Sequence, residues 1–403
     1  MFDLSVLQQF VRTPTRFTFS HADKSIPPLS PSAPSALHFV PDELLEEILS
    51  FCPSSTLCQL SLTDWRLNRI ANSFLYKDAK PSSADKMLVF FITVCMQPYL
   101  ARHVRTLDIE HSLSKVMLDT PFNESIFARR LRKLGNRRTN SHKPILRNAL
   151  TLVNAALKSM TSLTNLTLIM PDGDAHVEYT SLLSGVEFQL LHFHTSIRIN
   201  DEVIAFLAKQ SLLEDLKIYS TAPNESHYLQ SLPTTALPSL TALSWSSKTS
   251  MEAVRALLSN RPVTKATIHL HPGTAFSNVL SVGPQASKQI TTINLAFRDR
   301  SRPSATQLRT LATAFPHIES LSLSFAALSK GTVQQITDAI ESFFRIKELC
   351  LFEHSPRDEL EREDLMALTD VWFTLSKPLK SITFNLCEPS TVTKRVTRRR
   401  SET

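Results

Sequence analysis

Two pairs of histidines are the first residues whose types and spacing could support chemistry. His192 and His194 stand two residues apart, as do His269 and His271. On a β-strand, residues at this spacing share one face, and two imidazoles on one face could bind a transition metal. No third ligand of suitable spacing accompanies either pair. We therefore interpret all four as solvent-facing side chains and predict no metal site.

Motifs for other common chemistries are missing from the sequence. The chain has six glycines and contains neither GxGxxG nor GxxxxGK[ST], so it lacks the loops that bind nucleotide phosphates. It has no GxSxG motif, and its five cysteines are scattered without a CxxC pair. We predict a protein that is not an enzyme, has no catalytic residues and needs no cofactor.

Several features of the sequence predict the cellular location of the protein. Scattered cysteines fit a reducing compartment, and the N-terminus has no basic start followed by an apolar core, as a secretory signal would. The longest apolar run, 87–94, is far shorter than the roughly 20 residues of a membrane helix. We expect a cytoplasmic or nuclear protein without a membrane segment.

The formal net charge of +7 is unevenly distributed. The stretch from Arg129 to Lys143 holds seven basic residues and no acidic one, and the last 13 residues, 391–403, hold five basic residues and one acidic residue. Like-charge blocks are typical of solvated targeting or regulatory segments. We expect a basic insertion at about 129–143 and a disordered basic tail. The remaining body is slightly acidic and no aromatic residues interleave with the basic ones, which argues against a nucleic-acid partner.

The N-terminal region predicts a small helical unit. Residues 1–36 end in a stretch rich in proline and serine, which predicts a disordered leader. Pro41 suits a first helical turn, Pro53 ends that helix, and further helices are expected after it and over about 64–75. Three helices in about 40 residues bury too little surface to be stable alone. We expect a partner to cover part of the apolar stripe.

The stretch from Val40 to Tyr76 resembles an F-box, the motif that docks on the Skp adaptor of Skp–cullin–F-box ubiquitin ligases. The matching positions are Pro41, Glu43, Leu44, Leu45, Ile48, Leu49, Leu57, Leu60, Leu62, Ile70, Ala71, Leu75 and Tyr76. The family's frequent valine and aromatic sites fall on Thr63 and Leu67, with Trp65 two residues earlier. The resemblance implies an F-box over 37–80 with adaptor contacts from Pro41, Leu44, Leu45, Ile48, Leu49, Leu60, Leu62, Trp65, Leu67 and Ile70.

From residue 104 onward, the template apolar-x-x-apolar-x-apolar recurs ten times. Its middle residues are Leu107, Leu166, Leu191, Leu216, Leu243, Ala266, Ile293, Leu321, Leu349 and Ile382. After a first step of 59 residues they are 23–33 residues apart, near the repeat length of leucine-rich repeats, and helical patterns lie between them. The resemblance to that family implies an α/β solenoid over 81–390, a leucine-rich-repeat horseshoe with a parallel sheet on its concave face.

The residues between the inward pairs should face the concave surface. They are Asp108, Thr167, His192, Lys217, Ser244, Thr267, Asn294, Ser322, Cys350 and Thr383, a set too polar for a core. The next outward position adds His194, Tyr219, His269 and Phe352 among others. Because aromatic side chains are enriched in interface hot spots, we expect the partner-binding residues to be His192, His194, Lys217, Tyr219, His269 and Phe352.

Together the two resemblances imply a substrate-recognition subunit of a Skp–cullin–F-box ligase. The F-box would hold the adaptor and the cullin–RING core, and the solenoid would hold a protein substrate whose identity the sequence does not give. Such a chain contributes proximity, while the assembled ligase supplies catalysis. Two alternatives stay open at this point: a non-degradative F-box/leucine-rich-repeat scaffold, and a nucleic-acid-associated protein that uses the basic insertion and tail.

Overall fold

The computed structural model describes residues 39–109, 143–169, 179–219, 226–246, 249–258, 261–270, 288–297, 303–326, 328–354, 362–387 and 393–399. The chain divides into two compact units, one of residues 1–163 with 185–188 and one of residues 164–184 with 189–403. The expected leader and all of the basic insertion except Lys143 lie outside the described residues. No helix of the described ranges is long and apolar enough to cross a bilayer.

The first unit begins with the three short helices that the sequence predicts. They are α2 (Asp42–Ser50), α3 (Ser54–Leu60) and α4 (Trp65–Leu75), and prolines stand at the N-caps of the first two. The unit continues through β1 (Asp78–Ala79), α5 (Ala84–Met96), α6 (Pro98–Ala101), β2 (Thr106–Asp108) and α9 (Lys143–Ser159). β1 pairs in parallel with β2, and α5 packs against α9.

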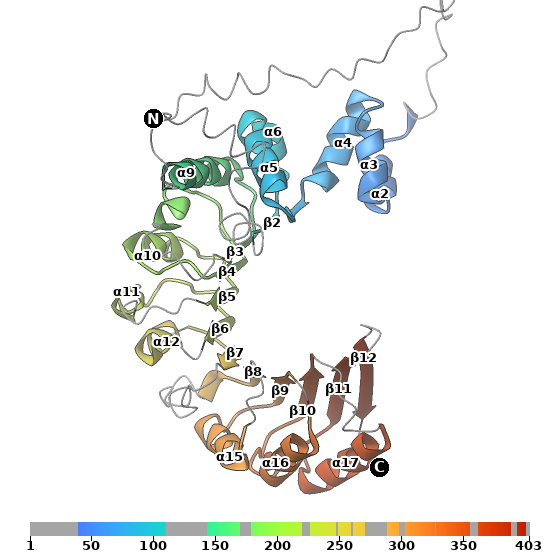
Figure 1. Cartoon of the computed structure of the whole chain (residues 1–403), viewed down its shortest axis with the longest axis vertical. Coiled ribbons are helices and arrows are strands. Elements are labelled where there is room, and N and C mark those ends of the chain that lie inside the picture. The colour runs from blue at the N-terminus through green and yellow to red at the C-terminus, as the bar shows by residue number, and fades with distance from the viewer. Residues whose placement is uncertain are drawn as a thin grey trace, which may run out of the picture. The chain divides into compact units, whose positions relative to one another are not determined.

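The second unit alternates strands with helices. Its strands are β3 (Asn165–Leu168), β4 (His192–Thr195), β5 (Asp215–Ile218), β6 (Ala242–Ser246), β7 (Lys265–Leu270), β8 (Thr292–Phe297), β9 (Ser320–Phe325), β10 (Glu348–Glu353), β11 (Ser381–Cys387) and β12 (Thr393–Arg399). Its helices are η2 (Tyr179–Leu183), α10 (Asp201–Ala208), α11 (Ser226–Gln230), α12 (Met251–Leu258), α15 (Ala305–Ala314), α16 (Lys330–Ile340) and α17 (Arg362–Leu375). In this unit the helices lie on one side of the strands (Figure 1).

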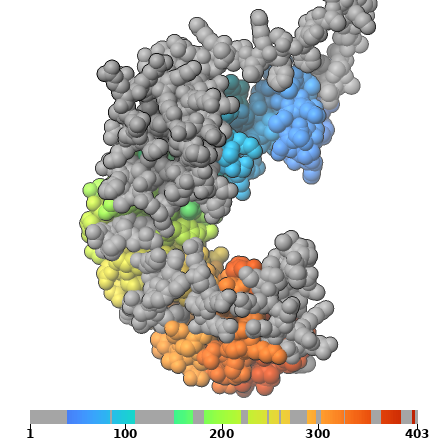
Figure 2. Space-filling view, in the orientation of Figure 1, coloured from blue at the N-terminus to red at the C-terminus, as the bar shows by residue number. Residues whose placement is uncertain are grey.

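The described strands form one twelve-stranded sheet in chain order. Neighbours from β3 to β11 are parallel, and the last pair, β11 with β12, is antiparallel. A parallel sheet that alternates with helices at this spacing is a leucine-rich-repeat-like α/β solenoid. The fold class expected from the repeats is therefore confirmed. In the space-filling view, the described residues of α15, α16 and α17 lie together, in orange and red (Figure 2).

A column of apolar side chains in strict register holds the second unit together. Its members are Leu166, Phe193, Leu216, Leu243, Ala266, Ile293, Leu321, Leu349 and Ile382, each 1% exposed or less. Equivalent residues on neighbouring strands are about 4.8 Å apart, so each packs on the next. Burying one such side chain contributes roughly 1.5–3 kcal/mol, and the column exists only when repeats stack.

The register of the third repeat differs from the prediction. The template placed Leu191 in the middle position, but Phe193 pairs with Leu166 on β3 and with Leu216 on β5. Leu191 is only half-buried, while Leu190 is fully buried and takes the first template position. The last inward position falls on Thr195, which is buried and whose hydroxyl accepts a hydrogen bond from the Ile197 N–H at 2.9 Å. Because this inward residue is polar, the apolar template did not match the sequence in the correct register.

The predicted disordered tail is also wrong over 393–399. These residues form β12, which pairs with β11 across its whole length. Arg398 explains the attachment: its guanidinium donates to the Met366 carbonyl at 3.1 Å and to the Thr369 hydroxyl at 2.8 Å, and pairs with Asp370 at 2.6 Å. A run of basic residues is thus the last strand of the sheet, held to α17 by one of its arginines.

A buried arginine supports the loop between α11 and β6. Arg261 is 2% exposed. Its guanidinium donates to the carbonyls of Pro233 and Ala236, both at 3.0 Å, and to those of Ala256 at 2.5 Å and Leu257 at 3.2 Å. The last two belong to the final turn of α12, whose carbonyls have no partners within the helix. Arg261 therefore joins the end of one repeat helix to the loop of the preceding repeat.

Candidate docking surfaces

The three N-terminal helices enclose a small apolar core. It consists of Leu45, Leu49, Leu57, Leu67, Ile70 and Ala71, with Val40, Cys52, Leu60, Phe74 and Leu75 packed against it. The two leucines on α2 are one turn apart and point toward α4, which supplies three of the core residues. The core fixes the orientation of α2, and so determines which of its side chains face outward.

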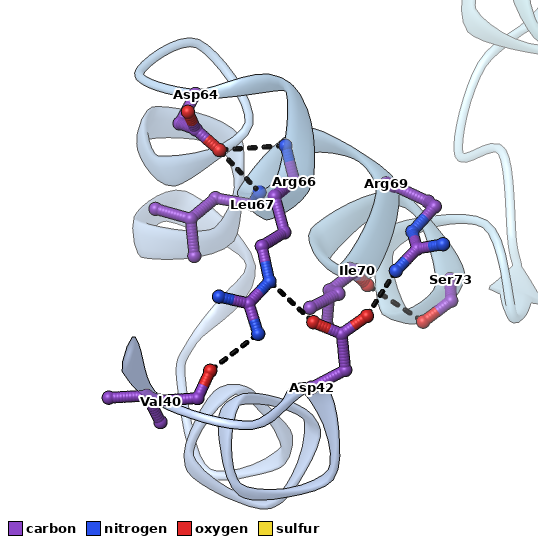
Figure 3. A network of polar contacts seen from close by, with 8 residues as sticks. All are labelled: Val40, Asp42, Asp64, Arg66, Leu67, Arg69, Ile70 and Ser73. Carbon is purple, nitrogen blue, oxygen red and sulfur yellow. Dashed lines mark hydrogen bonds and ion pairs between the residues drawn. The ribbon is translucent and has the colours of Figure 1, made fainter. Parts of the chain in front are cut away.

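A polar network joins the beginnings of α2 and α4 (Figure 3). Asp42 pairs with both Arg66 and Arg69, and Arg66 also donates to the carbonyl of Val40. Asp64 caps α4 by accepting from the Arg66 N–H at 2.7 Å. Asp42 also lies in the first turn of α2, where a negative charge complements the helix dipole. These contacts hold the N-terminal turn of α2 against α4.

Large apolar side chains remain exposed on the same helical unit. Leu44 is 51% exposed, Ile48 56% and Phe51 82%. They follow each other at i, i+4 and i+7, so Leu44 and Ile48 share one face of α2 and Phe51, its C-cap residue, continues that face. Leu62, in the turn between α3 and α4, and Trp65, the first residue of α4, are also exposed. The Arg69 guanidinium lies 6.0 Å from the Trp65 ring centroid. Five exposed large apolar residues in one small helical unit are the kind of surface that marks a protein interface.

The residues predicted to contact an adaptor divide into two groups. Pro41, Leu44, Ile48, Leu62 and Trp65 are exposed, and Leu60 is half-buried. Leu45, Leu49, Leu67 and Ile70 lie in the core of the unit, so the structure gives them the role of positioning the helices and not of surface contact. Sequence reasoning missed Phe51, although its spacing of three residues from Ile48 was visible in the sequence.

The second surface is the sheet face that points away from the helices of the second unit, here called the concave face. The corrected register of β4 changes two assignments on it. His194, not His192, aligns with Thr167 and Lys217, while His192 aligns with Asn165 and Asp215. From β5 onward the predicted concave residues align as expected, as in the pairs Lys217–Ser244 and Ser322–Cys350.

Asp215 is the centre of a charged cluster on β4 and β5. Its Oδ2 lies 3.4 Å from Nε2 of His194, 3.7 Å from Nζ of Lys217 and 3.9 Å from Nδ1 of His192. Burial raises the pKa of the Asp215 carboxyl, but the hydrogen bond with His194 and the charge of Lys217 outweigh burial and lower it overall. The carboxylate therefore stays charged and holds three side chains that the sequence predicted as partner contacts.

The remaining predicted contact residues are one ring pair and a separate phenylalanine. Tyr219, directly after β5, and His269 on β7 have ring centroids 5.2 Å apart. Phe352 on β10 is 36% exposed. It aligns with Ser324 on β9, whose hydroxyl forms a hydrogen bond with Nε2 of His354 at 2.6 Å. The structure thus brings Tyr219 and His269 together, and places Phe352 three strands away from His269.

The described residues include no group of three or more histidine, cysteine or acidic side chains placed to hold a metal ion. His192 and His194 both face Asp215, and His271 lies outside the described residues. Comparison of the sequence with protein-family models and with curated proteins finds no match in either set. The function must therefore be argued from the two surfaces themselves.

Proposed function

We propose that the protein is a substrate receptor of the F-box type, with α2–α4 docking on the Skp adaptor of a cullin–RING ubiquitin ligase and the concave face holding a protein substrate. The observation that carries the proposal is the apolar face formed by Leu44 and Ile48 of α2 together with Phe51, its C-cap residue, which the core of the unit leaves exposed. Fully burying side chains of this size stabilises a complex by roughly 1.5–3 kcal/mol each.

The surrounding contacts support a preformed docking surface. Asp42, Arg66 and Arg69 hold the first turn of α2 against α4, and Leu45 and Leu49 anchor its inner face. A partner that meets α2 would bind a helix whose orientation is already set, which lowers the entropy cost of association. The resemblance of Val40–Tyr76 to an F-box and the repeat architecture that follows agree with this proposal.

In the proposed mechanism, the chain acts through proximity. The adaptor surface and the concave face belong to one polypeptide, so a bound substrate and the ubiquitin-loaded enzyme of the ligase would be held in a single complex. The effective concentration of a tethered substrate lies in the millimolar range for short links. No catalytic side chain is required of this chain.

The proposal is tested by capturing partners in cells with and without a proteasome inhibitor. A receptor predicts proteins that co-purify with the wild-type chain, carry ubiquitin and accumulate when the proteasome is blocked. The Ile48→Asp variant should keep these partners but lose the adaptor and leave the partners unmodified, because Ile48 is on the helical surface and not on the concave face.

Two outcomes would count against the receptor role. Partners that are bound but never carry ubiquitin would favour a non-degradative scaffold. Failure of the wild-type chain to retain the adaptor would remove the F-box assignment itself. Val89→Asp is a matched control, because Val89 on α5 is equally exposed but does not lie on α2.

A further inference from the structure

The β12 edge of the described sheet offers backbone hydrogen-bonding groups to a further strand. β12 is the last strand of the sheet, and among the described strands it pairs with β11 alone (Figure 1). In an antiparallel pair, every second residue directs its N–H and C=O groups away from the partner strand. About half of the residues of Thr393–Arg399 therefore present these groups at the edge of the sheet.

β12 is long enough and held firmly enough to serve as a template. The strand at the other end of the sheet, β1, has two residues, whereas β12 pairs with β11 over seven. Arg398 joins the strand to α17 by pairing with Asp370 and donating to the Met366 carbonyl. The hydroxyls of Thr397 and Thr383 share a hydrogen bond of 3.3 Å between the two strands. Because the strand is already ordered, a second strand can bind to it at a lower entropy cost.

The charge of β12 is of one sign. Its seven residues include no acidic residue and four basic ones, which are Lys394, Arg395, Arg398 and Arg399. Asp370 pairs with Arg398, whereas Arg399 is exposed. β11 has no charged residue, and Glu348 on β10 lies two strand intervals from Arg399 in the register, about 10 Å away. Ion pairs form within about 4 Å, so this edge keeps a positive charge.

This charge restricts which strands can pair with β12. Basic residues on an edge strand normally prevent pairing, because a neutral or basic strand would desolvate them without supplying a counter-charge. A second copy of β12 is excluded for this reason, since like charges would face each other. An acidic strand has the opposite effect, because opposite charges on neighbouring strands stabilise the pair. The edge therefore selects for an acidic strand.

A nucleic acid would match the charge of β12 but not its backbone. Phosphates can pair with arginines, but a nucleic acid has no row of alternating N–H and C=O groups that could extend a β-sheet. β12 also has no aromatic side chain on which bases could stack. Edge backbone groups and basic charge together fit an acidic polypeptide.

We infer that β12 binds an acidic, extended segment of a partner protein, which joins the sheet as a further strand. In strand addition, main-chain hydrogen bonds supply affinity and side-chain positions supply selectivity. The segment binds the edge of the sheet and neither the outer face of α2 nor the concave face. The inference therefore does not depend on the proposed function.

The test uses a peptide of alternating glutamate and valine, matched to β12 in length, and two control peptides. A lysine–valine peptide reverses the charge. The glutamate–valine peptide N-methylated at every residue keeps the charge but has no backbone N–H groups. Fluorescence anisotropy with the full-length protein should show binding of the first peptide, none of the lysine peptide, and at least roughly tenfold weaker binding of the methylated peptide, which loses several hydrogen bonds. Equal binding of the two glutamate peptides, or no binding of the first, would overturn the inference.

Hydrogen–deuterium exchange determines where the peptide binds. The glutamate–valine peptide should slow the exchange of amides within residues 393–399, and the methylated peptide should not. Binding that leaves exchange in β12 unchanged would place the site elsewhere and contradict the inference. The same protection by single-stranded oligothymidylate would show that negative charge alone is recognised, which also contradicts it.

A charge reversal tests the side chains at the edge. Arg399→Glu should weaken binding of the glutamate–valine peptide roughly tenfold, because it replaces an attraction by a repulsion at an exposed position. Lys209→Glu is the matched control, since Lys209 is an exposed basic residue at the end of α10. Equal binding by the two variants contradicts recognition by charge. Thermal unfolding of both variants shows whether the fold is intact.

Discussion

Asp42 in the first turn of α2 and Arg66 in the first turn of α4 form an ion pair with 2.5 Å between Oδ1 and Nε, although 24 residues separate them in the sequence. The same guanidinium donates to the carbonyl of Val40, just before α2. One side chain of α4 therefore fixes both the start of α2 and the segment that leads into it. The exposed residues of the proposed docking surface, Leu44 and Ile48, belong to the helix held in this way.

We predict that Arg66→Met weakens the anchoring of α2 by about 1–3 kcal/mol, because it removes charge-assisted hydrogen bonds to Asp42 and to a backbone carbonyl. Hydrogen–deuterium exchange of the α2 amides measures this directly. Arg69→Met is the control, since the Arg69 side chain is 58% exposed and its pair with Asp42 should contribute less than about 1 kcal/mol. Equal exchange in both variants would contradict the assigned role of Arg66.

Arg261 offers a test of the solenoid. Arg261→Met should destabilise the second unit by roughly 3 kcal/mol or more, because several buried carbonyls would lose their donors at once. Arg261→Lys should restore little of the lost stability, since an ammonium group cannot reproduce the planar fork of donors of a guanidinium. Thermal unfolding provides the measurement, with the exposed Lys209→Ala as control. If Arg261→Met melts at the same temperature as the wild type, the stabilising role assigned to Arg261 is wrong.

The Asp215 cluster predicts a pH dependence of stability. The pKa of this carboxyl is lower in the folded protein than in the unfolded chain, so its stabilising contribution is complete above the unfolded value of about 3.9 and is lost as pH falls through the folded value. The difference in unfolding free energy between the wild type and Asp215→Asn should therefore shrink as pH falls below about 4. A difference that grows on acidification below about pH 4 would reverse the assigned direction.

The attachment of β12 to α17 leads to a prediction about stability that could not be made from the sequence alone. Arg398→Ala removes the contacts with Met366, Thr369 and Asp370 and should lower the melting temperature of the second unit. Arg399→Ala should leave it unchanged, because Arg399 is exposed at the end of the strand. The same response in both variants would mean that β12 is not held through Arg398.

The sequence predicted the repeat architecture because its strongest signal is the apolar column itself. Leu216, Leu243 and Leu321 are core residues with regular spacing, and burial of such residues determines both the pattern and the fold. The register failed at β4 because Thr195 takes an inward position normally apolar, and the template matched better two residues earlier. β12 was not predicted because its attachment depends on Arg398. In a sequence pattern, an arginine indicates a solvent-exposed position.

The helical unit shows a different limit of sequence reasoning. Leu44 with Ile48 and Leu45 with Leu49 have the same i, i+4 spacing, so the outer pair cannot be told from the inner pair by spacing alone. The structure separates them, because only Leu45 and Leu49 face α4. Likewise the pairing of Asp42 with Arg66 depends on the packing of α2 against α4, which no local pattern encodes.

Docking on the adaptor through the outer face of α2 is the central claim, and calorimetric titration of the purified full-length protein with the Skp adaptor tests it most directly. The wild type and the Val89→Asp control should bind alike. Leu44→Asp should weaken binding by a factor of about a hundred or more, because an unpaired charge at an apolar interface costs roughly 3 kcal/mol or more. Thermal unfolding should stay near that of the wild type, since Leu44 is 51% exposed. Adaptor binding that survives Leu44→Asp unchanged, or that is absent from the wild type, would contradict the account.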